Sequence, residues 1–207
     1  MPLIRKGAAP PAAPDRPGDA EDGLRAGASD ERWAAARALA GRPEAAPALG
    51  AALLAEEDAR VREAILTALA RVGTPESAGF VARLVRSDDA ERRTAALDAL
   101  RAMPQVLEAE MTRLLDDPEA DVRLLACDLA RDMAAPVATA MLCGLLAREP
   151  EANVCAAAVD VLAECGGPEA LPALAECAKR FADVPFLVFA TRIAGDRIRA
   201  QTSARDG

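Results

Sequence analysis

The sequence predicts an all-α fold, a right-handed α-solenoid in which short helix hairpins stack side by side. The first observation is a pattern that repeats about every 30 residues, and such a period is typical of repeat architectures. Basic residues near the start of each first helix recur at steps of 30, 31 and 30 residues: Arg32, Arg62, Arg93 and Arg123, with Cys155 in the fifth place. Prolines that open each second helix recur at steps of 32, 29, 32 and 32 residues: Pro43, Pro75, Pro104, Pro136 and Pro168.

The second observation is the helical spacing of apolar residues inside one period. Val61, Ile65 and Leu69 recur every four residues and therefore share one helix face. The turn at 73–75, Gly-Thr-Pro, then ends this helix and begins the next, since Gly favours a C-terminal cap and Pro the first helical position. A single hairpin cannot bury its apolar face alone, so neighbouring copies must cover it.

The recurring text carries a family resemblance. Short motifs recur in the same order: an acidic residue, a V-R or similar pair, A-x-x-A-L and then P-E-A. Two examples are DARVREAILTALARVGTPES and NVCAAAVDVLAECGGPEA. This text resembles the HEAT-like repeat of bacterial proteins, in the short form also found in phycobilin lyase subunits. The resemblance covers residues 29–199 and implies about five HEAT-like helix hairpins plus a C-terminal capping helix. We expect the hairpins at 29–55, 57–86, 88–115, 117–148 and 149–181, and the cap at 184–199.

The two ends of the chain are expected to lie outside the array. Residues 1–28 are dominated by Pro, Ala, Gly and Asp, which predicts a disordered arm. Its tip, residues 2–6 (PLIRK), is apolar and then basic. The tip is either an unstructured terminus or a docking peptide for a partner or for the array itself. Residues 200–207 are expected to be a frayed tail.

Composition limits the partners and the compartment. The formal net charge is −8, and an acidic array repels phosphate backbones, so we expect neither nucleic acid nor an anionic membrane as partner. No uncharged run reaches the length of a spanning helix, and the first residues are too short for a secretory core. The five cysteines include no C-x-x-C pair, which favours small apolar fillers in a reducing compartment. We therefore expect a cytoplasmic protein.

The aligned arginines have acidic residues close by in the sequence. We expect them to form a ladder of ion pairs between adjacent repeats, and the alternative is an arginine row that grips an acidic partner. The ladder residues are Arg62, Arg93, Arg123, Asp58, Asp89 and Asp121. Trp33, at the open end of the array, either covers the exposed core or stacks on a ligand.

A partner-binding surface is expected on the second helices, which the resemblance places on the concave side. The fifteen residues 133–147 carry no charge, so this helix is either covered or offers an apolar patch. The predicted partner-binding residues are Arg83, Arg86, Arg113, Met141, Leu142 and Leu145. The last helix either caps repeat five or forms a homodimer contact through Phe186, Val188 and Phe189.

Catalytic motifs are not recognised in this sequence, which contains no His. It has no Gly-rich phosphate loop, Ser–His–Asp set or metal-binding H-E-x-x-H helix, so we predict no catalytic residue, cofactor or metal ligand. The expected function is a non-catalytic scaffold or adaptor that binds another protein on the concave face, by analogy in a bacterial regulatory or signalling complex. The alternatives are a phycobilin-lyase-like enzyme subunit, with a ligand-sized pocket between second helices, and an assembly factor or chaperone for a metalloenzyme.

Overall fold

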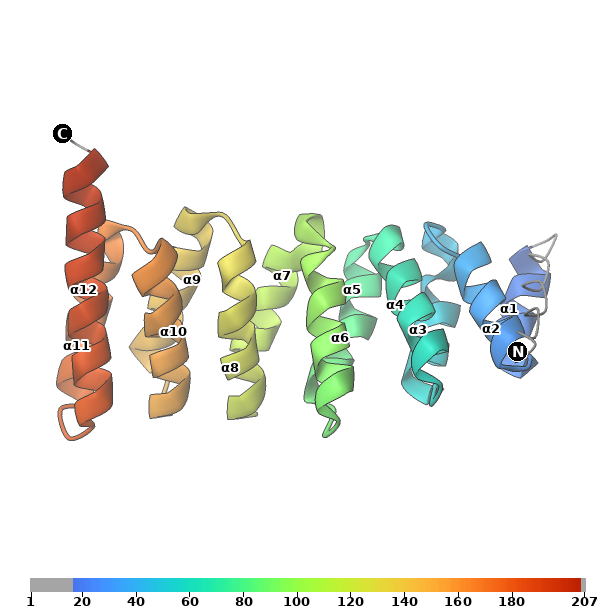
Figure 1. Ribbon diagram of the computed structural model, residues 1–207, viewed down its shortest axis with the longest axis horizontal. Helices are drawn as coiled ribbons and strands as arrows, with labels where there is room; N and C mark the ends of the chain where they lie inside the picture. The colour runs from blue at the N-terminus through green and yellow to red at the C-terminus, as the bar shows by residue number, and fades with distance from the viewer. Residues whose placement is uncertain (1–16, 206–207) are drawn as a thin grey trace, which may run out of the picture. The chain divides into compact units, whose positions relative to one another are not determined.

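The computed structural model describes residues 17–205, which form twelve α-helices joined by short loops and 3-10 turns (Figure 1). No β-strand occurs between residues 17 and 205. The chain divides into two compact units, Met1–Val106 and Leu107–Gly207. The all-α helical-repeat fold expected from the sequence is thereby confirmed.

The first unit contains two rows of helices (Figure 1). Its elements are α1 (Pro17–Ala26), α2 (Ser29–Ala38), η1 (Pro43–Ala45), α3 (Ala46–Ala55), α4 (Ala59–Val72), α5 (Pro75–Ala82), η2 (Arg83–Arg86) and α6 (Ala90–Arg101). The first helices α2, α4 and α6 contact one another in order, and the second helices α3 and α5 form the other row. Leu49, Leu53, Ile65 and Leu69 are fully buried, so the core lies between the rows.

The second unit repeats this arrangement. Its elements are α7 (Pro104–Leu115, whose first residues belong to the first unit), α8 (Ala120–Leu129), η3 (Ala130–Asp132), α9 (Ala135–Arg148), α10 (Ala152–Cys165), η4 (Pro168–Ala170), α11 (Leu171–Arg180) and α12 (Pro185–Arg205). Helices α8, α10 and α12 form one row, and α9 packs on α11 in the other. The second unit buries Leu129, Leu142, Leu145 and Leu162 between these rows.

Local chemistry fixes where the helices begin and end. The Asp58 carboxylate accepts hydrogen bonds from the N–H groups of Arg60 and Val61 and so caps α4. Gly73, with φ of 62°, ends α4 in the left-handed conformation that glycine adopts without strain. Thr74 and Ser77 then form a reciprocal capping box at the start of α5.

Residues 17–26 and 200–205 are helical, whereas the sequence predicted a disordered arm and a frayed tail there. Residues 17–26 of the predicted disordered arm form α1, because Ala20 and Leu24 lie four residues apart and are buried in its packing against α2 and α3. At the other end α12 continues to residue 205, since Ile198 is buried and the hydroxyls of Thr202 and Ser203 bond to carbonyls one turn earlier. Residues 1–16, including the tip 2–6, and residues 206–207 lie outside the described part of the chain.

Candidate binding surfaces

The aligned arginines brace the loops that precede their own helices. Each guanidinium donates from Nη1 to a loop carbonyl five or six residues earlier: Arg32 to Gly27 at 3.0 Å, Arg62 to Glu57 at 3.3 Å, Arg93 to Ser87 at 2.7 Å and Arg123 to Asp117 at 2.8 Å. A loop carbonyl has no helical partner, and the arginine supplies one. The arginines that recur about every 30 residues thus have the same structural role, which is to bond the loop before their own helix.

The aspartates of the predicted ladder have different partners from those expected. Asp58 and Asp89 cap α4 and α6 through backbone N–H groups, and Asp58 also accepts from the Ser29 hydroxyl of the preceding repeat. Asp121 is exposed in the first turn of α8. A carboxylate directly before a helix satisfies free N–H donors there. Asp89 also lies 3.6 Å from Nε of Arg92 on its own helix, so its ion-pair partner is not the aligned Arg93.

A different set of loop side chains occupies one recurring position of the repeat. The position recurs at steps of 31, 30 and 32 residues, and in each case the side chain accepts a hydrogen bond from the N–H two residues later. The set is Glu56, Ser87, Asp117 and Glu149. Arg32 bonds Glu56 at 2.9 Å through both Nε and Nη2, and Arg123 bonds Glu149 at 2.7 and 2.8 Å. These two bidentate pairs are the ion pairs that the aligned arginines form.

Burial and charge set the ionisation of the two glutamates. The hydrogen bond from Arg32 holds the pKa of Glu56 below its ordinary value, although burial opposes it. Burial raises the pKa of Glu149, but hydrogen bonds from Arg123 and from the Glu151 N–H outweigh it and the net shift is downward. Only 2% of Glu149 is exposed, so the ionised carboxylate depends on these donors.

The fifth repeat replaces the aligned arginine with Cys155. Here Arg180, from α11, replaces the aligned arginine as the donor to this loop. It donates to the carbonyls of Glu149 at 2.9 Å and Leu146 at 2.6 Å. The Cys155 thiol lies 3.6 Å from the same Glu149 carbonyl. Cys155 is buried, as are Cys127 and Cys177, and burial raises the pKa of the Cys127 thiol to about 12.

The predicted partner-binding residues separate into core and surface. Leu142 and Leu145 are 0% and 1% exposed and face the core of the second unit, so they are unavailable to a partner. Met141 is half-buried on the outer side of α9, and Arg113 is exposed on α7, bonded to Glu110 at 3.1 Å. Arg83 and Arg86 are exposed on η2 in the first unit. The uncharged run 133–147 is therefore mainly core on one face and small side chains on the other.

A groove separates the second helices α7 and α9 in the second unit. We call it the α7–α9 groove, with a volume of about 390 Å³ and a lining of Thr112, Leu115, Asp116, Ala140, Met141, Gly144 and Arg148. Arg148 pairs with Asp116 across the groove and donates to the Gly144 carbonyl at 2.7 Å. A Cβ built on Gly144 would meet only Arg148, at 3.9 Å, so the wall at this residue is open.

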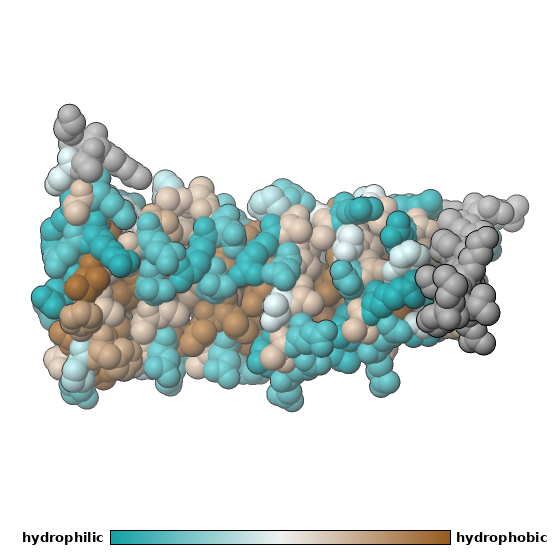
Figure 2. Space-filling model, viewed as in Figure 1, coloured by the Kyte–Doolittle hydropathy of each residue, from teal (hydrophilic) through white to brown (hydrophobic). Residues whose placement is uncertain are grey.

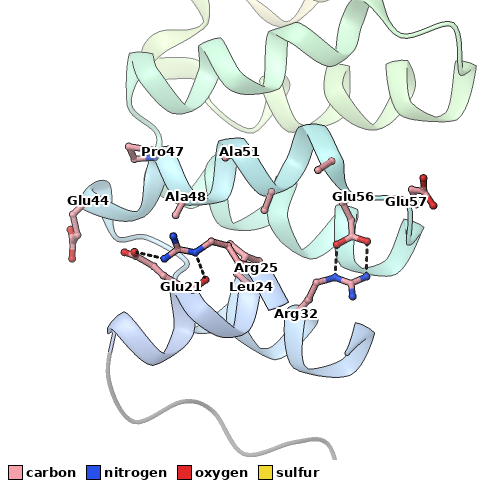
Figure 3. Close-up of a pocket in the computed structure, with 12 residues that line it drawn as sticks. Glu21, Leu24, Arg25, Arg32, Glu44, Pro47, Ala48, Ala51, Glu56 and Glu57 are labelled. Carbon is pink, nitrogen blue, oxygen red and sulfur yellow. Dashed lines mark hydrogen bonds and ion pairs between the residues drawn. The ribbon is translucent and has the colours of Figure 1, made fainter. Parts of the chain in front are cut away.

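A larger hollow lies beside α3 in the first unit (Figure 3). We call it the α3 hollow; its volume is about 720 Å³, and it is lined by Glu21, Leu24, Arg25, Arg32, Glu44, Pro47, Ala48, Ala51, Ala52, Ala55, Glu56 and Glu57. Figure 3 shows Glu44 and Glu57 near opposite ends of α3, with Arg25 and Arg32 pointing toward Glu21 and Glu56. The sequence did not reveal this site, because the composition of residues 1–28 predicted a disordered arm, whereas α1 forms one wall of the hollow.

A known protein family matches most of this chain. The family model of HEAT repeats matches residues 20–101 and 108–184. The chain belongs to the HEAT-repeat family. This match confirms the HEAT-like resemblance read from the sequence. A search of curated proteins finds no match.

Several solved structures match this chain at low sequence identity and with TM-scores below 0.5. A designed armadillo repeat protein in complex with the peptide (KR)4 is 18% identical, with a TM-score of 0.44, and covers 89% of this chain and 100% of its own. The complex of CpcE and CpcF of phycocyanin lyase from Nostoc sp. PCC7120 is 16% identical, with a TM-score of 0.42. The match covers 95% of this chain and 100% of the matched chain. An engineered protein is 18% identical, with a TM-score of 0.43 and coverage of 89% and 96%.

The last helix of this HEAT-repeat chain presents exposed aromatic residues. Phe186 and Phe189, on the first turns of α12, are 52% and 57% exposed, and Figure 2 shows apolar surface over this part of the helix. Val188 is half-buried in a small groove between α11 and α12. Neighbouring Arg192 lies over the Phe189 ring, 5.2 Å from its centre.

Trp33 lies between two arginines on the first-helix row. The guanidinium groups of Arg37 and Arg60 are each 4.6 Å from its ring centre, and the side chain is half-buried between α2 and α4. Cation–π contacts of this kind already engage the ring.

Residues 17–205 contain neither a cluster of metal ligands nor a helix that could span a membrane. This part of the HEAT-repeat chain contains no group of three or more His, Cys, Asp or Glu side chains placed to hold a metal ion. None of its helices combines the length and the apolar character that crossing a membrane requires.

Proposed function

We propose that this chain is a non-catalytic scaffold or adaptor that binds a partner protein on its second-helix face. The observation that carries the proposal is the α7–α9 groove, where Ala140 and Gly144 provide small surfaces and Met141 an adaptable apolar one. Grooves between helices accept the apolar face of a partner helix or an extended segment. The Asp116–Arg148 pair across the groove supplies polar groups that fix the direction of such a segment.

The charge of the chain favours one class of partner. With a formal net charge of −8, the chain repels nucleic acid and attracts proteins with basic surfaces. Arg113, exposed on α7, and Met141 remain the proposed partner contacts of the second unit, and Arg83 and Arg86 those of the first. A cytoplasmic regulatory or signalling complex in a bacterium is the setting that we propose.

A charge placed in the groove tests the proposal. Ala140 is exposed on α9 and lines the groove, whereas Ala200 is exposed on α12 outside it, so Ala140→Glu and Ala200→Glu make the same chemical change at two exposed helical positions. The wild-type chain and Ala200→Glu should retain the same protein from the native cell extract, and Ala140→Glu should lose it. Equal retention by the two variants would rule out the groove as the binding site.

A small-ligand role is the second candidate, and the same groove favours it. The groove volume of about 390 Å³ falls within the range of about 300–1,000 Å³ common for ligand pockets. The ionisable groups Asp116 and Arg148 line it, as the enzyme-subunit alternative requires. Titration with a linear tetrapyrrole pigment separates the candidates: tight binding that Ala140→Glu abolishes would favour an enzyme subunit of the bilin-lyase type, and no binding would favour the scaffold.

We also propose that α12 provides a homodimer contact. Two phenylalanines that are more than half exposed at one helix end are a surface that association would cover. Sedimentation equilibrium should show a dimer that Phe189→Asp dissociates. A monomer at all concentrations would refute the contact.

A further inference from the structure

The α3 hollow combines an apolar floor with unbalanced negative charge. Its floor is Ala48, Ala51, Ala52 and Ala55, whose spacing of three and four residues places them on one face of α3. Ala51 and Ala55 are exposed, and small side chains let another chain approach the helix closely. Leu24 of α1 adds a buried apolar residue to the lining.

The charges around this floor do not cancel. Four glutamates and two arginines line the hollow, so it holds an excess of negative charge. Arg32 pairs with Glu56 at 2.9 Å, and Arg25 lies 3.8 Å from Glu21. Glu44 and Glu57 are exposed, and no ion pair involves either carboxylate within residues 17–205. A ligand for this hollow is therefore expected to be aliphatic in its middle and basic at an end.

The chain itself contains such a segment. Residues 2–6 read Pro-Leu-Ile-Arg-Lys, with two aliphatic side chains followed by two cations. We propose that Pro2–Lys6 docks in the α3 hollow of its own chain, with Leu3 and Ile4 over the alanine floor and Arg5 and Lys6 at the carboxylates of Glu44 or Glu57. This docking is independent of the α7–α9 groove, which lies in the other unit.

The dimensions of the hollow and of the chain allow this docking. Ala48 and Ala55 are about 10 Å apart along the helix, at 1.5 Å per residue. Five extended residues span about 17 Å, so the segment covers the floor and reaches beyond it to an acidic end. The ten residues from 7 to 16 reach up to about 33 Å before Pro17 opens α1, which forms one wall of the same hollow.

The lysines of the chain make the docking directly testable. Lys6 and Lys179 are the only lysines in the sequence. A carbodiimide joins a lysine amine to a carboxylate only when the two are in contact, and it can be applied to the full-length protein at low concentration, followed by peptide mapping. Lys179, which lies 3.2 Å from Glu176, provides an internal positive control.

We expect an intramolecular link from Lys6 to Glu44 or Glu57. The double variant Leu3→Asp with Ile4→Asp should lower its yield by about tenfold or more, since burial of one aliphatic side chain already changes occupancy by that factor. The Lys179–Glu176 link should not change, which shows that the carbodiimide reacts equally well with the variant. Glu44→Gln with Glu57→Gln should remove the Lys6 link.

Three results would overturn the docking. Lys6 could link equally to exposed carboxylates outside the hollow, such as Glu63 on α4. The yield could stay the same in the Leu3→Asp and Ile4→Asp variant. The link could also appear only in covalent dimers, which would assign the hollow to the segment of a second copy.

Discussion

The buried Arg123–Glu149 pair leads to a large and specific stability prediction. Replacing Arg123 with Met removes two charge-assisted contacts, of 2.7 and 2.8 Å, from a carboxylate whose side chain is 1% exposed. It also removes the donors to the carbonyls of Asp117 and Pro118. Breaking a buried ion pair by removing one partner costs about 3–5 kcal/mol, because the other charge remains buried without compensation. We expect Arg123→Met to lower the free energy of unfolding by about this amount.

Urea unfolding followed by circular dichroism measures this loss, with Lys179→Met as the matched control. Lys179 and Glu176 form an ion pair whose side chains are 74% and 69% exposed, and such pairs contribute about 0–1 kcal/mol. The double variant Arg123→Met with Glu149→Met should be more stable than Arg123→Met alone, because it no longer buries a charge. If Arg123→Met and Lys179→Met cost the same, the Arg123–Glu149 pair is not buried as described.

Three further predictions follow from burial and ionisation. Because the folded-state pKa values of Glu56 and Glu149 are lowered, their stabilisation is complete above the unfolded value of about 4.3 and is lost as the pH falls through the folded values. The urea midpoint should therefore fall below that pH, less steeply in Glu149→Gln, and an equal slope in both proteins would contradict the assignment. Leu142→Ala should lower the free energy of unfolding in urea by about 2–5 kcal/mol, since Leu142 is fully buried. A loss below about 1 kcal/mol would contradict this burial. A maleimide should label the half-buried Cys143 and Cys165 in the folded protein well before the buried Cys127, Cys155 and Cys177, as mass spectrometry would show; uniform labelling would refute these burial assignments.

The fold class could be predicted because the repeat places strong local signals at fixed intervals. The turn at 73–75 is an example: Gly73 adopts a positive φ, and Thr74 caps the helix that Pro75 opens. These signals act within a few residues, so the sequence alone expresses them. Helix α1 was missed because its Gly and Pro content suggests disorder, whereas two buried residues, Ala20 and Leu24, suffice to pack it on its neighbours.

The candidate sites were harder to predict because their contacts join residues that are distant in sequence. Arg123 and Glu149 are 26 residues apart, and the aspartates near the arginines in the sequence act as helix caps instead. The uncharged run 133–147 did not show which face of α9 is buried, because no charged side chain marks the solvent side. Helical spacing turns Ala138, Leu142 and Leu145 to the core and leaves Ala140 and Gly144 outside, so the surface is a groove with small residues and not a leucine patch.

Hydrogen–deuterium exchange of the chain with and without its captured partner protein tests the binding face most directly. If the second helices form the binding surface, exchange should slow in the segments 112–116 and 140–148, which contain the residues that line the α7–α9 groove. Slowing confined to the first helices α8 and α10 would contradict the proposed binding face.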